Sequence, residues 1–262
     1  MDNQEAQFKE PGEEIQESIQ EREEIIAPEN FVSIYHETKT ENLPFINRDG
    51  LTINTENKNI GKAEVMARRN RMIDKLRPEA LKEQGISRES NIFAYPFLEE
   101  GHGLIGADQR FIKRDEKMLR DQFETFRTYS PNYLRKLGTS TPEEFIKKMT
   151  DPEYLRREYP GEVLQIKVDP KKCYVGDVEY ITRIMDDIHR GFTESQAVQL
   201  EGEIYWICMV TLEDFLKWYR KPKGAYSYTL LKDAPNNLPS EFILPEILIP
   251  ENVPQNHIKL VK

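Results

Sequence analysis

The chain has 262 residues, 38% hydrophobic content and a formal net charge of −9, which suits one sizeable hydrophobic core. It contains no apolar run near the roughly 20 residues that a membrane-spanning helix needs, and it begins without the basic and apolar segments of a secretory signal. Its two cysteines are too few for a disulfide framework or a zinc site. We therefore expect a cytoplasmic protein that does not enter a membrane, with a secreted effector as the alternative.

The negative charge is concentrated at the N-terminus. Residues 1–30 carry ten acidic and two basic side chains, a local charge of −8, which leaves −1 for the rest of the chain. A segment with so much charge and so few apolar residues cannot bury enough surface to fold alone. We expect residues 1–28 to form an acidic, disordered arm that solvates the protein or binds a partner. Residues 29–262 are expected to form a single domain.

The first half of that domain begins with a predicted strand and a short helix. Aromatic and β-branched residues favour the strand at 31–36. Thr40 is a candidate helix cap, and Gly50 is a candidate left-handed helix terminator. The elements predicted next are helices at 62–76 and 79–84, separated by Pro78, and a strand at 90–96.

A glycine-rich segment follows the second strand. Gly101, Gly103 and Gly106 have the spacing of a dinucleotide-binding fingerprint, but no strand–helix–strand unit surrounds them. The sequence therefore predicts a flexible lid at residues 99–108 and argues against a Rossmann fold.

The next fifty residues are predicted to be helical. Leu119, Phe123 and Phe126 form an apolar stripe in a charged helix at 110–128. The segment Thr141-Pro142-Glu143-Glu144 is typical of a helix start, with a threonine cap and proline in the first turn. We expect a helical insertion at about residues 108–159.

Short strands dominate the second half. Residues 162–168 alternate between apolar and polar with period two, as a half-buried strand does. The apolar run at 204–210 predicts a fully buried strand that contains Cys208 and follows a charged turn. Further strands are predicted at 173–175, 226–231, 246–249 and 258–261, and helices at 177–189 and 211–218. The pattern indicates an α+β body of mostly antiparallel short strands.

Residues 35–51 resemble the opening of ADP-ribosyltransferases of the diphtheria-toxin and poly(ADP-ribose) polymerase type. That family has a strand with an aromatic-His-Gly-Thr/Ser pattern, then a helix with Asn, Leu and Ile, then Gly-Leu. The residues in step with it are Tyr35, His36, Thr38, Asn42, Ile46, Gly50 and Leu51, whereas Glu37 stands where the family usually has glycine. The resemblance implies a core of two small packed sheets.

The C-terminal part, from Leu244 to Ile258, resembles the ending of the same family. Glu246 heads a strand of branched aliphatic residues, and a turn and a last strand follow. The middle member of the family's His-Tyr-Glu triad should lie on the 91–95 strand. Phe93 and Tyr95 both qualify because alternate residues of a strand point the same way, and Tyr95 is the closer chemical match.

The resemblance implies that NAD⁺ is the substrate, without a metal, and that ADP-ribose is transferred to a protein or nucleic-acid acceptor or to water. Glu246 would stabilise the positive charge that develops on the ribose. An aromatic ring, of Tyr95 or Phe93, would stack on nicotinamide. His36 would bind the adenosine ribose, and Tyr35 and Thr38 would complete the NAD⁺ site.

Other interpretations remain open at this point. The segment Gln199-Leu200-Glu201-Gly202-Glu203 contains the Gln-x-Glu and Glu-x-Glu patterns of arginine-modifying toxins, which makes Glu201 and Glu203 alternative catalytic residues. Those toxins carry an arginine on the first strand, where this chain has His36, so the alternative ranks second. A non-catalytic ligand- or partner-binding protein on the same fold is a further possibility. An NAD-dependent RNA 2′-phosphotransferase ranks third, because no convincing set of basic residues for an RNA phosphate is evident.

Overall fold

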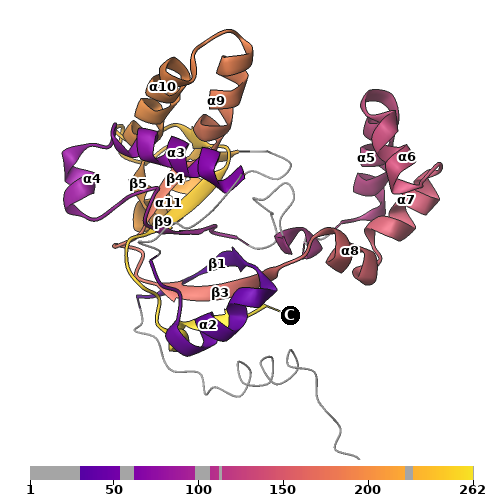
Figure 1. The fold of residues 1–262 in the computed structure, drawn as a ribbon, viewed down its shortest axis with the longest axis horizontal. Helices are drawn as coiled ribbons and strands as arrows, with labels where there is room; N and C mark the ends of the chain where they lie inside the picture. The colour runs from indigo at the N-terminus through magenta and orange to yellow at the C-terminus, as the bar shows by residue number, and fades with distance from the viewer. Residues whose placement is uncertain (1–29, 54–61, 98–106, 112–113, 222–226, 262) are drawn as a thin grey trace, which may run out of the picture.

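The computed structural model describes residues 30–53, 62–97, 107–111, 114–221 and 227–261 (Figure 1). The predicted acidic arm at 1–28 and the three glycines of the predicted lid lie outside these residues. Among the residues described, none of the helices combines the length and the apolar character that crossing a bilayer requires.

Two antiparallel sheets form the centre of the molecule, with the strand orders β1-β3-β10 and β2-β9-β4-β5. Their strands are β1 (Val32–Thr38), β2 (Ile92–Ala94), β3 (Glu162–Val168), β4 (Tyr174–Asp177), β5 (Val210–Thr211), β9 (Pro245–Ile249) and β10 (Ile258–Leu260). A third small sheet consists of β6 (Tyr219–Arg220), β7 (Tyr228–Leu230) and β8 (Glu241–Phe242). Small antiparallel sheets together with many helices make this an α+β protein, as the sequence predicts.

One hydrophobic core joins the two central sheets. The first sheet contributes Ile34 and Leu164, and the second contributes Ile92, Val175 and Ile247, all of which are buried. The period-two alternation predicted for β3 is confirmed from Leu164 onward, since every second side chain is buried there. The sheets thus pack through the faces that their apolar residues define.

The two sheets also meet through their backbones. Tyr35 and Tyr95 form an isolated antiparallel bridge, in which each backbone N–H donates to the other residue's carbonyl at 2.9 and 2.8 Å. This bridge brings the middle of β1 against the end of β2. It therefore places His36 next to Phe93, although 57 positions separate the two residues.

The chain after β1 differs in detail from the predicted helix. A 3₁₀ turn (Thr40–Asn42) precedes helix α2 (Leu43–Asp49), and Thr40 is not the cap, because its Oγ1 lies 3.4 Å from Glu162 Oε1 instead. Gly50 ends α2, as predicted, and its φ of 79° is positive, but its ψ of −170° is not that of the predicted left-handed helical conformation. A Cβ on Gly50 would lie 2.3 Å from the carbonyl oxygen of Val253, so only glycine fits there.

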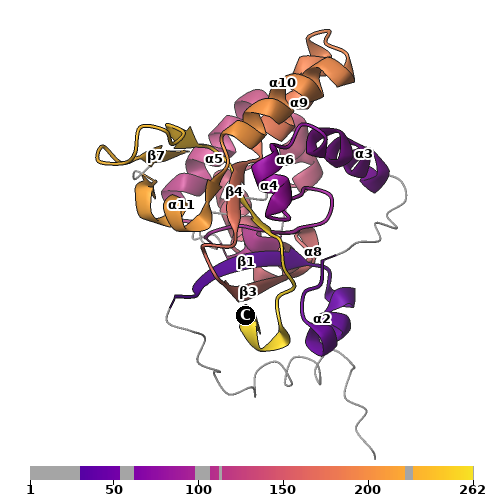
Figure 2. The same ribbon diagram turned by 90° about the vertical axis from the view of Figure 1, so that its left-hand side faces the viewer.

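Helices cover the outer face of the second sheet. Ile73, Ile184, Tyr205 and Trp206 pack with Leu248 of β9 in a second hydrophobic cluster. Figures 1 and 2 show α9 and α10 at one end of the molecule, beyond β4, and α2 at the opposite end, beyond β1 and β3. The helices on this side are α3 (Lys62–Asp74), α4 (Glu79–Glu83), α9 (Glu179–His189) and α10 (Glu194–Ile207), and α11 (Leu212–Trp218) follows β5.

Four helices between β2 and β3 have a hydrophobic cluster of their own, which includes Leu119, Phe123 and Phe145. They are α5 (Glu116–Tyr129), α6 (Pro131–Leu137), α7 (Pro142–Met149) and α8 (Pro152–Glu158), and Figure 1 shows them to one side of the sheets. The predicted Thr141 cap is confirmed as a full capping box with Glu144. Helix α5 starts at Glu116, later than predicted, because Asp115 caps it by accepting from the Met118 N–H at 2.7 Å.

The strand predicted at 204–210 is wrong. Most of that segment belongs to helix α10, which begins at a capping box between Thr193 and Gln196. Cys208 is therefore the C-cap of a helix and only partly buried. A short apolar run fits a buried strand and a buried helix equally well. The helix is favoured because buried residues recur four apart along it, at Ala197, Val198, Glu201, Gly202, Tyr205 and Trp206.

Candidate functional site

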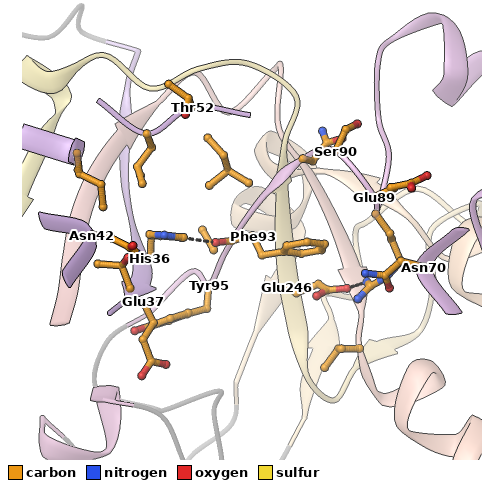
Figure 3. A pocket seen from close by; sticks show the side chains of 18 of the residues that line it. His36, Glu37, Asn42, Thr52, Asn70, Glu89, Ser90, Phe93, Tyr95 and Glu246 are labelled. Carbon is orange, nitrogen blue, oxygen red and sulfur yellow. Dashed lines mark hydrogen bonds and ion pairs between the residues drawn. The ribbon is translucent and has the colours of Figure 1, made fainter. Parts of the chain in front are cut away.

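A cavity of about 980 Å³ lies where the two central sheets meet. Its wall is formed by β1, α2, the middle of α3, the loop before β2, β2 itself and the start of β9. Five of the candidate catalytic and NAD⁺-binding residues line it, namely His36, Thr38, Phe93, Tyr95 and Glu246, whereas Tyr35 is not among the lining residues. His36 and Glu246 are far apart in the chain, yet the fold brings both to this one cavity (Figure 3).

At one end of the cavity, His36 is held by a backbone contact. Its Nδ1 lies 2.7 Å from the carbonyl oxygen of Phe93. A carbonyl oxygen only accepts, so Nδ1 carries the proton and donates. Burial lowers the pKa of His36, and the bond to Phe93 opposes this effect without cancelling it. The ring is therefore neutral near pH 7, which leaves Nε2 as a hydrogen-bond acceptor for a ligand.

The neighbours of His36 on β1 point the other way. Side chains alternate along a strand, so His36 and Thr38 share one face, and Tyr35 and Glu37 share the opposite face. The Tyr35 ring stacks on the Tyr95 ring with centroids 6.1 Å apart. Burial lowers the pKa of Arg110, and the charges of Glu162 and, more weakly, of Glu37 oppose that lowering in part. Glu37 thus has a cationic neighbour on the face away from His36.

At the other end, Glu246 is held by a buried arginine and a buried tyrosine. Its Oε1 forms an ion pair with Arg88 Nη1 and accepts a hydrogen bond from the Tyr205 hydroxyl at 2.9 Å. Arg88 Nη1 also donates to the Tyr205 oxygen at 2.8 Å. The Arg88 side chain is 5% exposed and that of Glu246 is 15% exposed. Both side chains line the cavity, and the carboxylate is the more exposed of the two.

The two candidate aromatic residues belong to different ends of the cavity. Phe93 is half-buried, and the Arg88 guanidinium lies 5.1 Å from the centroid of its ring. Tyr95 is buried with Val163 and packs on Tyr35. Figure 3 shows the Phe93 ring beside Glu246, and Tyr95 nearer to Glu37. Phe93 is thus the aromatic residue that neighbours the carboxylate.

Apolar residues form much of the lining, and among its polar residues the acidic and neutral side chains outnumber the basic ones. Arg88 is the one arginine among the described lining residues, and no lysine is among them. The acidic members are Glu37, Asp49, Glu89 and Glu246, and the neutral polar members are Thr38, Asn42, Thr52, Asn70, Ser90 and Asn91. The polar part of the described lining therefore consists of carboxylates, hydroxyls and amides together with a single guanidinium, which already pairs with Glu246.

The alternative glutamates are placed elsewhere. Glu201 and Glu203 both lie on α10, and neither is among the residues that line the cavity. Glu201 is buried against Asp187 of α9, and burial, followed by the Asp187 charge, raises its pKa. Glu203 is exposed and pairs with Gln199 on its own helix. The charged turn predicted for this segment is wrong, because the segment is part of α10.

Sequence reasoning missed Arg88 and Tyr205. The segment Arg88-Glu89-Ser90 reads as a loop closure, and Tyr205 lies in the segment wrongly predicted as a strand. The signal for Tyr205 is the spacing of four from Ala197 to Glu201 to Tyr205, which places it on the buried face of a helix. Nothing local identifies Arg88, because its partners lie 117 and 158 positions away.

Within the described part of the chain, no group of three or more His, Cys, Asp or Glu side chains could hold a metal ion. Comparisons with protein-family models, with curated proteins and with solved structures found no match to this chain.

Proposed function

We propose that this protein transfers ADP-ribose from NAD⁺ to a protein or nucleic-acid acceptor, or to water. The observation that carries the proposal is the shared cavity of His36, Phe93 and Glu246, with a neutral acceptor at one end and a carboxylate at the other. A volume of about 980 Å³ is at the upper end of the range for small-molecule sites. A dinucleotide, which is an extended ligand with two riboses, suits a cavity of this size.

The proposed reaction breaks the bond between nicotinamide and the C1′ carbon of its ribose. The electron pair of that bond leaves with nicotinamide, and the C1′ carbon gains positive charge. The acceptor nucleophile then donates an electron pair to C1′ and loses a proton. Glu246 binds the 2′-hydroxyl of this ribose and stabilises the developing charge, which is the kind of electrostatic contribution that most accelerates such a step.

The remaining residues bind the substrate. Phe93 stacks on the nicotinamide ring, because it is the aromatic residue next to Glu246. His36 Nε2 accepts a hydrogen bond from a hydroxyl of the adenosine ribose. Thr38, on the same face of β1 as His36, helps to seat the nicotinamide amide. Tyr35 and Tyr95 support this end of the cavity through their backbone bridge and their stacked rings.

The same proposal extends to the fold. An ADP-ribosyltransferase core has two small packed sheets of mostly antiparallel strands, and its catalytic glutamate heads a strand. Here β1-β3-β10 packs on β2-β9-β4-β5, and Glu246 is the second residue of β9. The helices α5–α8 are then an insertion between two core strands.

A second candidate is a protein that binds an NAD-like ligand without reacting it. Glu37 favours this alternative, because it lines the cavity and its negative charge would repel the phosphates of NAD⁺. An RNA 2′-phosphotransferase ranks below both, because one arginine among the described lining residues is a poor match for RNA phosphates.

The test measures binding and turnover separately. Calorimetry with NAD⁺, ADP-ribose and nicotinamide reports binding, and release of nicotinamide from labelled NAD⁺ with and without a cell extract reports reaction and transfer. Binding with turnover is the expected result. Binding without turnover in any extract supports the non-catalytic candidate, and absence of both overturns the proposal. Arg220→Gln, an exposed change on β6 outside the cavity, is the control for nonspecific effects.

A further inference from the structure

The Glu246 carboxylate is held from one side only. Within the described residues, both of its partners, Arg88 Nη1 and the Tyr205 hydroxyl, bind the same oxygen, Oε1. A carboxylate has two oxygens, each able to accept. Since Glu246 also lines the cavity, Oε2 is the oxygen that a ligand hydroxyl can reach.

The loop that carries Arg88 is fixed to the end of α3. Asp74 Oδ1 accepts from the Arg88 backbone N–H at 2.9 Å, and Asp74 Oδ2 accepts from the Ser87 hydroxyl at 2.6 Å and the Glu89 N–H at 3.1 Å. Asn91 closes the loop by accepting from the Ser87 N–H at 2.7 Å. Arg88 Nε donates to Asn70 at 3.2 Å. Arg88 is therefore anchored at its backbone N–H and at its Nε, which leaves Nη1 to meet Glu246.

The position of Tyr205 depends on a glycine in the facing strand. Gly176 of β4 is paired in register with Glu246 of β9. A Cβ on Gly176 would lie 2.6 Å from the Tyr205 ring, a distance that real contacts essentially never show. Glycine thus leaves the slot through which the ring passes to reach the carboxylate. The Arg88 guanidinium covers that ring, 4.8 Å from its centroid.

We propose that Arg88 and Tyr205 are positioning residues, which hold the Glu246 carboxylate ionised and turn its Oε2 toward the cavity. This inference rests on the proposed function only in taking Glu246 as the group that meets the ligand. Charge-assisted hydrogen bonds are the strong ones, and a buried carboxylate without such donors tends to become protonated. Arg88 and Tyr205 thus form a clamp on Glu246, which determines both the charge and the direction of its carboxylate.

The charges around this clamp come from four elements. Arg88 and Glu89 belong to the loop before β2, Asp74 to α3, Asp177 to β4 and Tyr205 to α10. The pKa of Tyr205 is raised, first by burial and then by Asp74 and Asp177, although Arg88 lowers it. Tyr205 thus remains a neutral donor at neutral pH. Arg88 is then the cation that offsets the Glu246 charge.

The test is a pH titration of the Glu246 carboxyl carbon by NMR in protein labelled with ¹³C-glutamate, assigned with Glu246→Gln. Tyr205→Phe keeps the ring and removes one donor, so we expect the midpoint for Glu246 to rise by about one pKa unit. Arg88→Lys should raise it as well, because lysine cannot reproduce the fixed guanidinium geometry. Tyr180→Phe, on α9, is the matched control and should leave the midpoint unchanged.

An unchanged midpoint in Tyr205→Phe overturns the proposal, and Arg88→Lys decides by the same criterion if Tyr205→Phe does not fold. In turnover, Tyr205→Phe should lower kcat on the order of tenfold with little change in KM. A purely structural role would lower the melting temperature and leave the midpoint and the kcat of the folded protein unchanged. The titration needs no NAD⁺, so a raised midpoint without any NAD⁺ turnover refutes the proposed function and not the clamp.

Discussion

At one end of the cavity the polar group is a neutral imidazole held by a backbone carbonyl, and at the other end it is a carboxylate held by a buried guanidinium. His36 can therefore accept a hydrogen bond from a hydroxyl, but because it is uncharged it produces only a weak electrostatic field. Glu246 carries a charge in a partly desolvated place, where electrostatic interactions are strong. Under the proposed function, this difference predicts that the His36 end contributes mainly to substrate binding, which KM reports, and the Glu246 end mainly to the chemical step, which kcat reports.

The largest effect is expected at the charged end. Glu246→Gln keeps the size of the side chain and much of its hydrogen bonding but removes the charge, so kcat should fall on the order of 10²–10³. The affinity for NAD⁺ should change much less, because the positive charge develops mainly in the transition state. Nicotinamide release at saturating NAD⁺, together with calorimetric binding, measures the two quantities.

Glu203→Gln is the matched control for that change. Glu203 is exposed on α10 and lies outside the cavity, so its loss should leave both parameters unchanged. If Glu203→Gln abolishes turnover while Glu246→Gln does not, the charged end of the cavity has been assigned to the wrong glutamate.

The next effect concerns the ring beside the carboxylate. Phe93→Ala should weaken NAD⁺ binding roughly tenfold, because a stacked ring contributes about 0.5–1.5 kcal/mol beyond its buried area. Phe93→Tyr keeps a ring and should retain most of the affinity. Tyr95→Phe, which keeps the packing on Tyr35, should have little effect. A larger loss for Tyr95→Phe than for Phe93→Ala would reassign the stacking role to Tyr95.

A smaller effect, confined to binding, is expected at the neutral end. His36→Asn retains a donor near the position of Nδ1 and removes the Nε2 acceptor, so KM for NAD⁺ should rise about fivefold with kcat nearly unchanged. Steady-state kinetics at pH 7.5 measures this change. A fall in kcat with unchanged KM would show that both ends take part in the chemistry, which removes the distinction between them.

The same histidine makes a prediction about pH. Burial lowers the pKa of His36 from its ordinary value of 6.5, so below pH 6.5 the unfolded chain binds a proton that the folded protein does not. The free energy of unfolding should therefore decrease as the pH falls through this window and be unaffected by His36 above it. Urea unfolding between pH 5 and 7.5 should show a shallower slope for His36→Asn than for the wild type.

The sequence anticipates some parts of this site and not others, for identifiable reasons. The alternation in β3 and the Thr141 cap are local patterns, and both predictions hold in the structure. His36 and Glu246 were joined only by a family resemblance, and the structure places both on one cavity. Residues 204–207 were assigned to the wrong element, because an apolar run carries no period. Arg88 acquires its meaning from Glu246 and Tyr205, which no local pattern connects to it.

The smallest expected effect contrasts Glu246 with Glu201, a buried glutamate that is not among the residues lining the cavity. Glu201 lies on α10 facing the Asp187 carboxylate. Burial first, and then Asp187, raise the pKa of Glu201 above 4.5, and Arg183 opposes them only in part. Above pH 4.5 the folded protein therefore binds more protons than the unfolded chain. Protonated Glu201 therefore contributes to the free energy of unfolding at low pH. This contribution is lost as the pH rises through the raised pKa that Glu201 has in the folded protein.

Glu201→Gln removes this titration and supplies an amide that can donate to Asp187. The free energy of unfolding should increase by about 1 kcal/mol at pH 7.5 and change little at pH 4, with NAD⁺ turnover unaffected. Urea unfolding at the two pH values measures the difference.

Glu246→Gln should do the opposite and lower the free energy of unfolding, because it leaves the buried Arg88 charge without its counter-ion. If Glu201→Gln destabilises the protein at pH 7.5, the ionised Glu201 is stabilised by Arg183. The two glutamates would then be held by the same kind of cationic contact.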